Sequence, residues 1–121
     1  MEINALQVED TRTLQLIFSF ALHHEFPKAY LTQLTHVSQA LTWMANPKNL
    51  SSLTHMFVDG ELPDGRGEKV IYDARRRNFQ GMIVFLSDTD PAPDTPIDMH
   101  LTKTLLNDQP EVLKKFMTSQ G

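Results

Sequence analysis

The spacing of apolar residues changes near the middle of the chain, and this change limits the folds that the chain can adopt. Up to about residue 58, apolar positions recur at intervals of three and four, as in helices that bury one face. The dipeptide Asp59-Gly60 and the segment 63–67 then give strong turn signals. Beyond them, runs rich in Val, Ile, Tyr and Phe indicate strands. We therefore expect a mainly helical α+β fold with one small sheet.

Size and composition fit a single globular domain. The chain has 121 residues, of which 40% are hydrophobic and 21% are charged. It contains no Cys, which excludes disulfides, Cys-ligated zinc and iron–sulfur clusters. We predict one domain over residues 1–121. It consists of a helical core with a hairpin (11–87), a Pro- and Asp-rich linker (88–97) and a C-terminal helical segment (98–121).

Residues 11–25 are predicted to form the first helix. The centre of this segment, 14–22, is apolar on most sides, which indicates burial against more than one neighbour. Asp10 or Thr11 caps the helix, because a short side-chain oxygen accepts hydrogen bonds from the first turn. Pro27 prevents the helix from continuing.

Residues 29–45 form the second helical region. One apolar stripe repeats along it at spacings of three and four: Leu31, Leu34, Val37, Leu41 and Met44. The region is either one long helix or two short helices joined by a turn at 35–37, with Ser38 capping the second. A further short helix is expected over 50–58.

The second half of the chain predicts a hairpin and a final helix. Residues 68–73 and 81–87 suit two strands, and the polar segment 74–80 between them suits an arginine-rich tip. The final helix starts at Asp98 or Thr102 and runs to residue 118. A proline at position 110 either kinks this helix or opens a separate one.

Five histidines prompt a test for a metal site. Two ligands share a helix face only at spacings of three or four residues, and no pair of these histidines has that spacing. The acidic stretch 88–98 also fails as a calcium loop. Ala92 and Pro93 stand where such a loop needs an oxygen ligand and a glycine. We therefore expect no metal site.

Motifs of common catalytic sites are missing from the sequence. It contains no G-x-S-x-G, no G-x-x-x-x-G-K-[ST] and no G-x-G-x-x-G. Carboxylate pairs exist, but the sequence shows no apolar pocket around one of them that would assign acid and base roles. We expect neither an enzyme nor a cofactor.

The order of the predicted elements is that of a winged helix–turn–helix. A buried helix precedes a helix–turn–helix and a further helix. A two-stranded β-hairpin with a basic tip then forms the wing, and a C-terminal helix comes last. In such a fold the recognition helix enters the major groove of DNA, and the wing reaches the backbone or the minor groove.

Three stretches resemble the MarR-type family of winged-helix transcriptional regulators. Residues 13–16 (TLQL) resemble the start of its core helix, and residues 34–40 (LTHVSQA) resemble its helix–turn–helix joint. Residues 73–77 (DARRR), followed by 82–87 (MIVFLS), resemble its wing. The resemblance covers about residues 11–88. It implies a DNA-binding transcriptional regulator that dimerises through its terminal helices.

The resemblance also implies how double-stranded DNA would be contacted. Hydroxyl and amide side chains of the recognition helix would contact phosphates or base edges, and basic side chains would neutralise phosphates. The DNA-binding residues that it implies are Ser38, Gln39, Thr42, Lys48, Arg66, Arg75, Arg76, Arg77 and Asn78.

The same residues also have structural interpretations. The arginines at 75–77 form a solvated hairpin tip balanced by Asp73 and Glu68, if they do not contact DNA. Gln39 and Thr42 then lie on an ordinary helix surface.

A second hypothesis is a small acidic protein-interaction factor that binds a partner protein instead of DNA. The net charge is −4 at pH 7, and the stretch 88–98 carries acids but no base. Such a surface would face a basic partner, as in immunity, anti-defence or adaptor proteins.

The sequence shows no targeting or membrane segment. No positively charged region precedes an apolar run at the N-terminus. The most apolar stretch, 14–22, is shorter than the roughly 20 residues that span a membrane. We expect a cytoplasmic protein. The apolar residues of the last helix would be hard to bury in a monomer, so we also expect a homodimer.

Overall fold

A central parallel sheet organises the molecule. The structure is a computed structural model, and it describes residues 2–118. All neighbouring strands of its five-stranded sheet are parallel. In pairing order, the strands are β2 (Tyr30–Leu34), β1 (Asn4–Val8), β3 (His55–Val58), β6 (Met82–Leu86) and β7 (Met99–Leu101). The predicted α+β class is therefore wrong, and the chain is an α/β protein.

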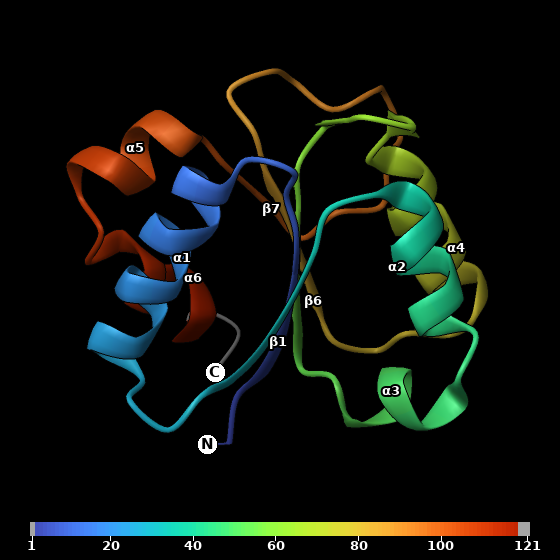
Figure 1. Cartoon of the computed structure of the whole chain (residues 1–121), viewed down its shortest axis with the longest axis horizontal. Coiled ribbons are helices and arrows are strands. Elements are labelled where there is room, and N and C mark those ends of the chain that lie inside the picture. The colour runs from blue at the N-terminus through green and yellow to red at the C-terminus, as the bar shows by residue number, and fades with distance from the viewer. Residues whose placement is uncertain (1, 119–121) are drawn as a thin grey trace.

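Helices cover both faces of this sheet (Figure 1). One face carries α1 (Arg12–Glu25), α5 (Lys103–Asp108) and α6 (Val112–Thr118). The other face carries α2 (Val37–Met44), α3 (Pro47–Ser52) and α4 (Glu68–Arg76). A short antiparallel ribbon, β4 (Glu61–Leu62) with β5 (Gly65–Arg66), follows β3. Among residues 2–118, no helix has both the length and the apolar character needed to cross a membrane. The strand order is that of a flavodoxin-like, doubly wound fold.

The central strands bury side chains on both faces of the sheet. In β1, Leu6 and Val8 join the core under α2 and α4, whereas Ala5 joins the core under α1. In β3, Met56 faces the first of these cores and Phe57 faces the second. A strand buried on both sides lacks the alternation of polar and apolar residues that marks a half-exposed strand. This explains why a search for periodicity misses β1 and β3.

The predicted wing is wrong in its first strand and in its tip. Residues 68–76 form α4, in which Val70, Ile71 and Ala74 are fully buried. This stripe has helical spacing, and its burial beside α2 outweighs the strand preference of Val and Ile. The second strand is confirmed as β6, but it pairs in parallel with β3 and β7. A β–α–β unit therefore stands where the winged helix–turn–helix was expected.

Two predicted helices are partly strand. In the region 29–45, β2 replaces the first of the two short helices, whereas the turn near 35–37 and the second helix, α2, are confirmed. The N-cap residue of α2 is His36, so the predicted cap by Ser38 is wrong. Leu31 and Leu34 are three residues apart, as on a helix, yet they pack on opposite faces of the sheet. The segment 50–58 likewise divides into the end of α3 and all of β3.

The remaining helices agree with the sequence. The helix predicted over 11–25 is confirmed as α1, with Thr11 at its N-cap position, but the predicted side-chain cap is wrong because Thr11 makes no capping hydrogen bond. The last helix is two helices, with Pro110 between them. Residues 119–121 of the predicted C-terminal segment lie outside the described residues. Leu106 and Leu113 are buried against the sheet of their own chain, so they no longer argue for a homodimer, which stays a prediction.

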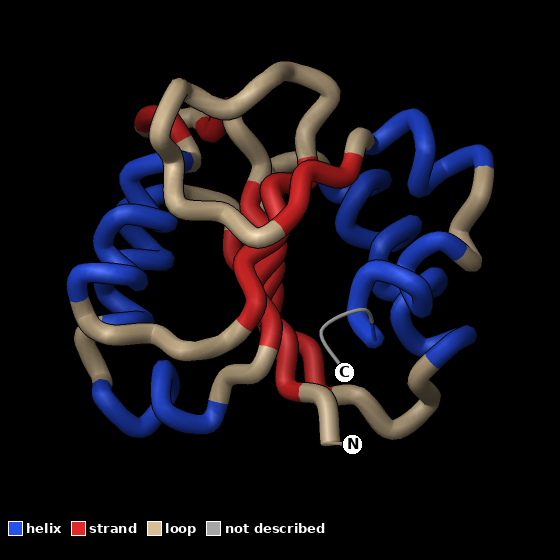
Figure 2. The backbone as a smooth tube through the Cα atoms, turned by 180° about the vertical axis from the view of Figure 1, so that it is seen from behind, coloured by secondary structure: helices blue, strands red, loops and turns tan. Residues whose placement is uncertain are grey.

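The connection from β6 to β7 contains neither helix nor strand over residues 87–98. Parallel strands are usually joined through a helix. Here a loop arches over one end of the molecule instead (Figure 2). Helix α4 holds this crossover: Glu68 accepts a hydrogen bond from Ala92 N at 2.9 Å, and the Tyr72 hydroxyl donates to Asp94 O at 3.2 Å.

Arg75 is the main anchor of the crossover. Its guanidinium donates to the backbone oxygens of Phe79 at 2.8 Å, Gly81 at 3.1 Å and Pro96 at 3.3 Å. It also pairs with Asp98 at 2.9 Å, and its side chain is only 26% exposed. Arg75 thus braces the interior of the fold from the end of α4.

Replacing Arg75 with alanine should lower the free energy of unfolding by about 2–4 kcal/mol, because three carbonyls and a carboxylate lose a charged donor. Arg76→Ala is the matched control. Its side chain is 77% exposed and pairs with Asp73, so its loss should stay below about 1 kcal/mol. Urea denaturation measures both values, and equal losses would contradict the bracing role of Arg75.

Candidate functional site

Four neighbouring strands bring polar side chains to one edge of the sheet. Glu9 and Asp10 directly follow β1, Asp59 follows β3 and Ser87 follows β6. Lys103 begins α5, just after β7. The carboxyl ends of parallel strands meet at one edge, and the strand order reverses between β1 and β3. A doubly wound sheet binds its ligands at such a switch point.

Lys103 joins two buried carboxylates at this edge. Its Nζ lies 2.9 Å from Glu9 Oε1 and 3.0 Å from Asp59 Oδ2. The side chains of Glu9 and Asp59 are only 2% and 6% exposed. Burial alone would lower the pKa of Lys103, but its hydrogen bonds to both carboxylates outweigh burial and raise that pKa. Lys103 therefore stays a cation.

Glu9 is fixed in place from several sides. Its Oε2 accepts a hydrogen bond from Thr11 N at 3.1 Å, and its backbone oxygen accepts one from Gln15 Nε2 at 2.8 Å. Burial raises the pKa of Glu9, although the hydrogen bonds from Lys103 and Thr11 act against this rise. The first turns of α1 thus hold a carboxylate at the end of β1.

Close packing positions Asp59. Its Oδ1 accepts a hydrogen bond from Glu61 N at 3.3 Å. The next residue must be glycine, because a Cβ on Gly60 would lie 2.6 Å from Cζ of the buried Phe85. A Cβ on Gly67 would lie 1.8 Å from the backbone oxygen of Asp59. The chain therefore folds tightly back over Asp59, and this fixes its carboxylate against Lys103.

Ser87 lies at the start of the crossover. It is 3% exposed, and its Oγ lies 2.9 Å from Oγ1 of Thr89. Its backbone oxygen lies 2.8 Å from His100 Nε2, and the His100 ring meets Phe85 edge-on at 5.5 Å between centroids. Ser87 is thus linked both to the crossover and to β7.

Of these side chains, Asp59, Ser87 and Lys103 line one cleft. It has a volume of about 510 Å³ and is lined by Asp10, Asp59, Glu61, Leu62, Pro63, Ser87, Asp88, Thr89 and Lys103. Two hollows of about 560 and 550 Å³ lie elsewhere, one beside α3 and one around 25–30. Within residues 2–118, neither hollow holds a group of three metal-ligating side chains. The functional site is therefore assigned to the cleft at the carboxyl edge.

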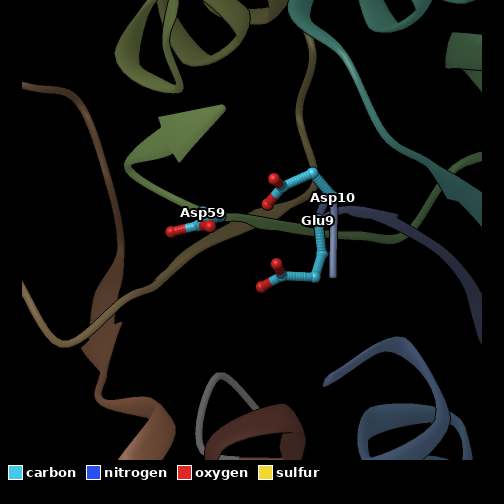
Figure 3. A group of neighbouring side chains, drawn as sticks. All are labelled: Glu9, Asp10 and Asp59. Carbon is cyan, nitrogen blue, oxygen red and sulfur yellow. The ribbon is translucent and has the colours of Figure 1, made fainter. Parts of the chain in front are cut away.

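Three carboxylates of this site fit a small, hard metal ion. Glu9, Asp10 and Asp59 each offer an oxygen, and these atoms lie within 4.8 Å of one another. Figure 3 shows the three side chains gathered around one space from the ends of β1 and β3. Carboxylate oxygens suit Mg²⁺ or Mn²⁺. The sequence-based expectation of no metal considered only histidines and a calcium loop, and it did not include this group.

The β4–β5 ribbon beside the cleft is tied to α2 by Asp64. Its carboxylate oxygens accept hydrogen bonds from Val37 N at 2.7 Å and Ser38 N at 2.9 Å. Asp64 thus caps α2 across the chain, since the N-cap residue His36 makes no side-chain cap. The bond from Ser38 N is the main cause that lowers the pKa of Asp64 to about 2, and the bond from Val37 N adds to it.

The structure disperses the residues that the family resemblance implied for DNA. Ser38, Gln39 and Thr42 are exposed on α2, and Lys48 is exposed on α3. Gln39 Oε1 accepts from Thr35 N at 2.8 Å. The remaining five residues lie on other elements: Arg66 on β5, Arg75 and Arg76 on α4, and Arg77 and Asn78 directly after α4.

Four of these residues are held by acids, since Arg75 pairs with Asp98 and Arg76 with Asp73 as described above. Arg66 pairs with Glu68 at 2.9 Å, and Arg77 pairs with Asp73 at 2.8 Å. The strand starts and the end of α4 lie at the edge opposite the cleft. The arginine-rich segment therefore has no part in the acidic site.

Sequence reasoning missed Glu9, Asp10, Asp59, Ser87 and Lys103. A signal was present: apolar runs at 56–58 and 82–86 each end in a polar residue, and the run 5–8 ends in two acids with only Gln7 interrupting it. Parallel strands would bring those ends together. The signal could not be used, because no parallel sheet was expected: 56–58 was assigned to a helix, 82–86 to a strand of an antiparallel hairpin, and 5–8 to no element.

Neither a protein-family model nor a curated protein matches the sequence. Solved structures do match along its whole length. The phosphorylated cyanobacterial phytochrome response regulator RcpA is 15% identical with a TM-score of 0.83, and the match covers 100% of this chain and 97% of that one. A CheY-like response regulator receiver domain protein from Methanospirillum hungatei JF-1 is 14% identical, with a TM-score of 0.81 and coverages of 99% and 94%. The Mn²⁺-bound form of response regulator Rcp1 is 15% identical, with a TM-score of 0.77 and coverages of 97% and 96%.

At these identities the likeness shows the fold. It overturns the resemblance to MarR-type regulators, because the neighbours are response regulator receiver structures and this chain shares their parallel sheet. The prediction of a DNA-binding transcriptional regulator with a recognition helix and a wing is wrong. The other hypothesis, a protein-interaction factor, agrees better with these neighbours.

The cap formed by Asp64 predicts a pH dependence. A carboxyl with a folded pKa of about 2, against an ordinary 3.8, stabilises the fold fully above pH 3.8 and loses this contribution as the pH falls towards 2. The stability advantage of the original chain over Asp64→Asn should therefore shrink on acidification. NMR titration of the Asp64 carboxyl carbon measures the midpoint directly, and a midpoint at the ordinary value would contradict the cap.

The carboxylate group predicts stabilisation by a divalent cation. At a Mg²⁺ concentration of ten times Kd, the gain should be about 1.4 kcal/mol, visible as a rise of a few degrees in Tm. Asp10→Asn should reduce this rise. Asp90→Asn removes the same charge from a side chain that is 96% exposed and outside the group, so it should keep the rise. Thermal unfolding with and without Mg²⁺ tests this, and equal rises in all three chains would refute the site.

Proposed function

We propose that this chain is a signal receiver domain that accepts a phosphoryl group on Asp59 and, in that state, changes its contact with a partner protein. One observation carries the proposal: Glu9, Asp10, Asp59, Ser87 and Lys103 stand together at the carboxyl edge of the sheet. The descriptions of two fold neighbours support it. RcpA is described as phosphorylated, and Rcp1 as Mn²⁺-bound.

Asp59 is the nucleophile in this proposal. One of its carboxylate oxygens attacks the phosphorus of a donor, and the new O–P bond forms as the bond from phosphorus to the leaving group breaks. The leaving group keeps the electron pair. The product is an acyl phosphate on Asp59. Burial of this carboxylate between Lys103 and the backbone of residue 61 fixes it for the attack.

Lys103 and Ser87 stabilise the added charge. The Lys103 ammonium already contacts Asp59, so it stands beside the phosphoryl oxygens as they gain charge. The Ser87 hydroxyl, on the neighbouring strand end, can donate a hydrogen bond to one of these oxygens when it leaves Thr89.

A divalent cation fits the carboxylates of Glu9, Asp10 and Asp59. When bound, it supplies charge neutralisation for the phosphoryl oxygens. Glu9 contacts Lys103, and the exposed Asp10 faces the cleft. Asp10 and Asp59 both line the cleft, whereas Glu9 does not, so these two carboxylates are the best placed to hold the ion.

In this proposal the chain is an acceptor of one phosphoryl group rather than an enzyme that turns over a substrate. Its output is a contact with a partner protein. The cleft is lined by three exposed acids, Asp10, Glu61 and Asp88, and the exposed Asp90 follows them in the crossover. This acidic surface suits a partner with a basic surface. This deepens the hypothesis of an acidic protein-interaction factor.

Ser87 is the route from the acceptor to the crossover. Its hydroxyl contacts Thr89, and its backbone oxygen contacts His100. When the hydroxyl turns to a phosphoryl oxygen, the contact to Thr89 is lost and the start of the crossover is released. The acidic surface around Asp88 and Asp90 then changes shape, and this is the change that a partner detects.

Phosphorylation by a small donor tests the proposal. Incubated with acetyl phosphate and Mg²⁺, the chain should gain the mass of one phosphoryl group, and hydroxylamine should remove it, as expected for an acyl phosphate. Asp59→Asn should gain none. Asp64→Asn, which changes an exposed aspartate of the nearby ribbon, is the matched control and should be labelled like the original chain. Intact-mass spectrometry measures the yields, and full labelling of Asp59→Asn would contradict the proposal.

A further inference from the structure

Gly60, the residue after Asp59, has a backbone nitrogen that can react with the Asp59 side chain once that side chain is phosphorylated. Asp59 is followed by Gly60, and the chain contains a second Asp-Gly pair, Asp64-Gly65. The amide nitrogen after an aspartate can attack the side-chain carbonyl carbon and close a cyclic imide. Glycine hinders this attack least, because it has no side chain. A free carboxylate resists the reaction, since it offers no good leaving group.

The geometry places the two reacting groups together. The Asp59 Oδ1 accepts a hydrogen bond from Glu61 N at 3.3 Å, so the carboxyl folds back over the backbone that follows it. Within the described residues, the Gly60 amide donates no hydrogen bond, and its nitrogen can therefore move without breaking one. The packing of Phe85 against Gly60 excludes any larger residue that would protect this bond.

The surroundings of Asp59 also favour the transition state. Oδ2 contacts Lys103 Nζ at 3.0 Å, and Oδ1 contacts Glu61 N. Whichever oxygen carries the phosphoryl group, the other faces a donor. That donor can stabilise the negative charge that develops on this oxygen during attack at the carbon.

We propose that phosphorylated Asp59 is closed by the Gly60 nitrogen into a succinimide, so that Asp59-Gly60 is also a site of conversion of aspartate to isoaspartate. The N–Cγ bond forms as the bond from Cγ to the phosphoryl-bearing oxygen breaks. Inorganic phosphate leaves with the electron pair, and the amide proton passes to water. Water then opens the imide at either carbonyl and yields aspartate or isoaspartate. This inference rests on the proposed phosphorylation of Asp59.

Isoaspartate at this position would prevent further phosphorylation of residue 59. The main chain gains one carbon at residue 59, and the remaining carboxylate becomes shorter by one carbon. The carboxylate then no longer meets Lys103 as before. In this scheme a fraction of the phosphorylation events converts Asp59 to isoaspartate, after which the chain can no longer be phosphorylated. The isoaspartate content of the protein therefore rises with the number of phosphorylation events.

The Asp64-Gly65 pair is a built-in control. It has the same two residues, lies five positions further along, and its aspartate is exposed. The carboxylate of Asp64 is held by Val37 N and Ser38 N and takes no phosphoryl group in the proposed function. Isoaspartate at residue 64 should therefore be independent of the phosphoryl donor.

The experiment follows both pairs in the full chain, incubated with acetyl phosphate and Mg²⁺ in water labelled with heavy oxygen. Intact mass reports the phosphoryl group, and peptide mapping reports isoaspartate at residues 59 and 64. We expect isoaspartate at residue 59 to rise several-fold over the donor-free sample, with heavy oxygen in the protein. Residue 64 should not change. Phosphate released by ring closure keeps its original oxygens, whereas phosphate released by water attack at phosphorus gains a heavy one.

Two variants sharpen the outcome. Asp59→Asn takes no phosphoryl group, but its amide can close the same ring by expelling ammonia, so it should form isoaspartate without any donor. Asp10→Asn should lose both the phosphoryl group and the donor-dependent isoaspartate. If the chain takes up the phosphoryl group and loses it with heavy oxygen only in the phosphate, ring closure is refuted and phosphorylation stands. If no phosphoryl group is gained, both proposals fall.

Discussion

The ion pair of Lys103 with Glu9 and Asp59 is the contact on which the rest of the structure depends. Two carboxylates buried side by side lose hydration and repel each other, and one ammonium at 2.9 and 3.0 Å compensates for both effects. The same contact joins the ends of β1 and β3 to the start of α5. The strand order therefore brings these charged groups together as well as forming the hydrophobic core. A strand order that separated β1 from β3 would part these two carboxylates and leave Lys103 able to pair with only one of them.

The crossover from β6 to β7 shows what replaces a helix in a layered fold. A helix would satisfy its own backbone and cover the sheet. In its absence, α4 supplies the missing partners: Glu68 binds the Ala92 amide, and Arg75 binds the Pro96 carbonyl. The crossover is thereby fixed at its middle and far end. Its near end, beside Ser87, lines the cleft at the carboxyl edge. In the proposed function, a change at Asp59 reaches first the part of the crossover that α4 does not hold.

The sequence predicts the elements whose boundaries are marked locally. Pro27 ends α1 and Pro110 divides the C-terminal helices, and both are visible in the sequence. It does not predict β1, because the buried Gln7 interrupts the apolar run and pairs with Gln33 on β2, a partner that only the fold reveals. The site was hidden for the same reason. Its residues follow the strands, so it can be recognised only when the strands are known to be parallel and adjacent.

Gly60 shows how packing and reactivity become linked at one position. The fold needs a residue without a side chain there, because Phe85 fills the space where a Cβ would lie. Phe85 in turn lies against His100, which contacts the backbone of Ser87. A bulkier residue after Asp59 would hinder the proposed ring closure, but it would displace the Phe85 ring. The close packing that fixes the Asp59 carboxylate therefore also leaves it next to the least hindered backbone nitrogen that a protein can offer. If Asp59 accepts a phosphoryl group as proposed, the packing that positions it also exposes it to ring closure.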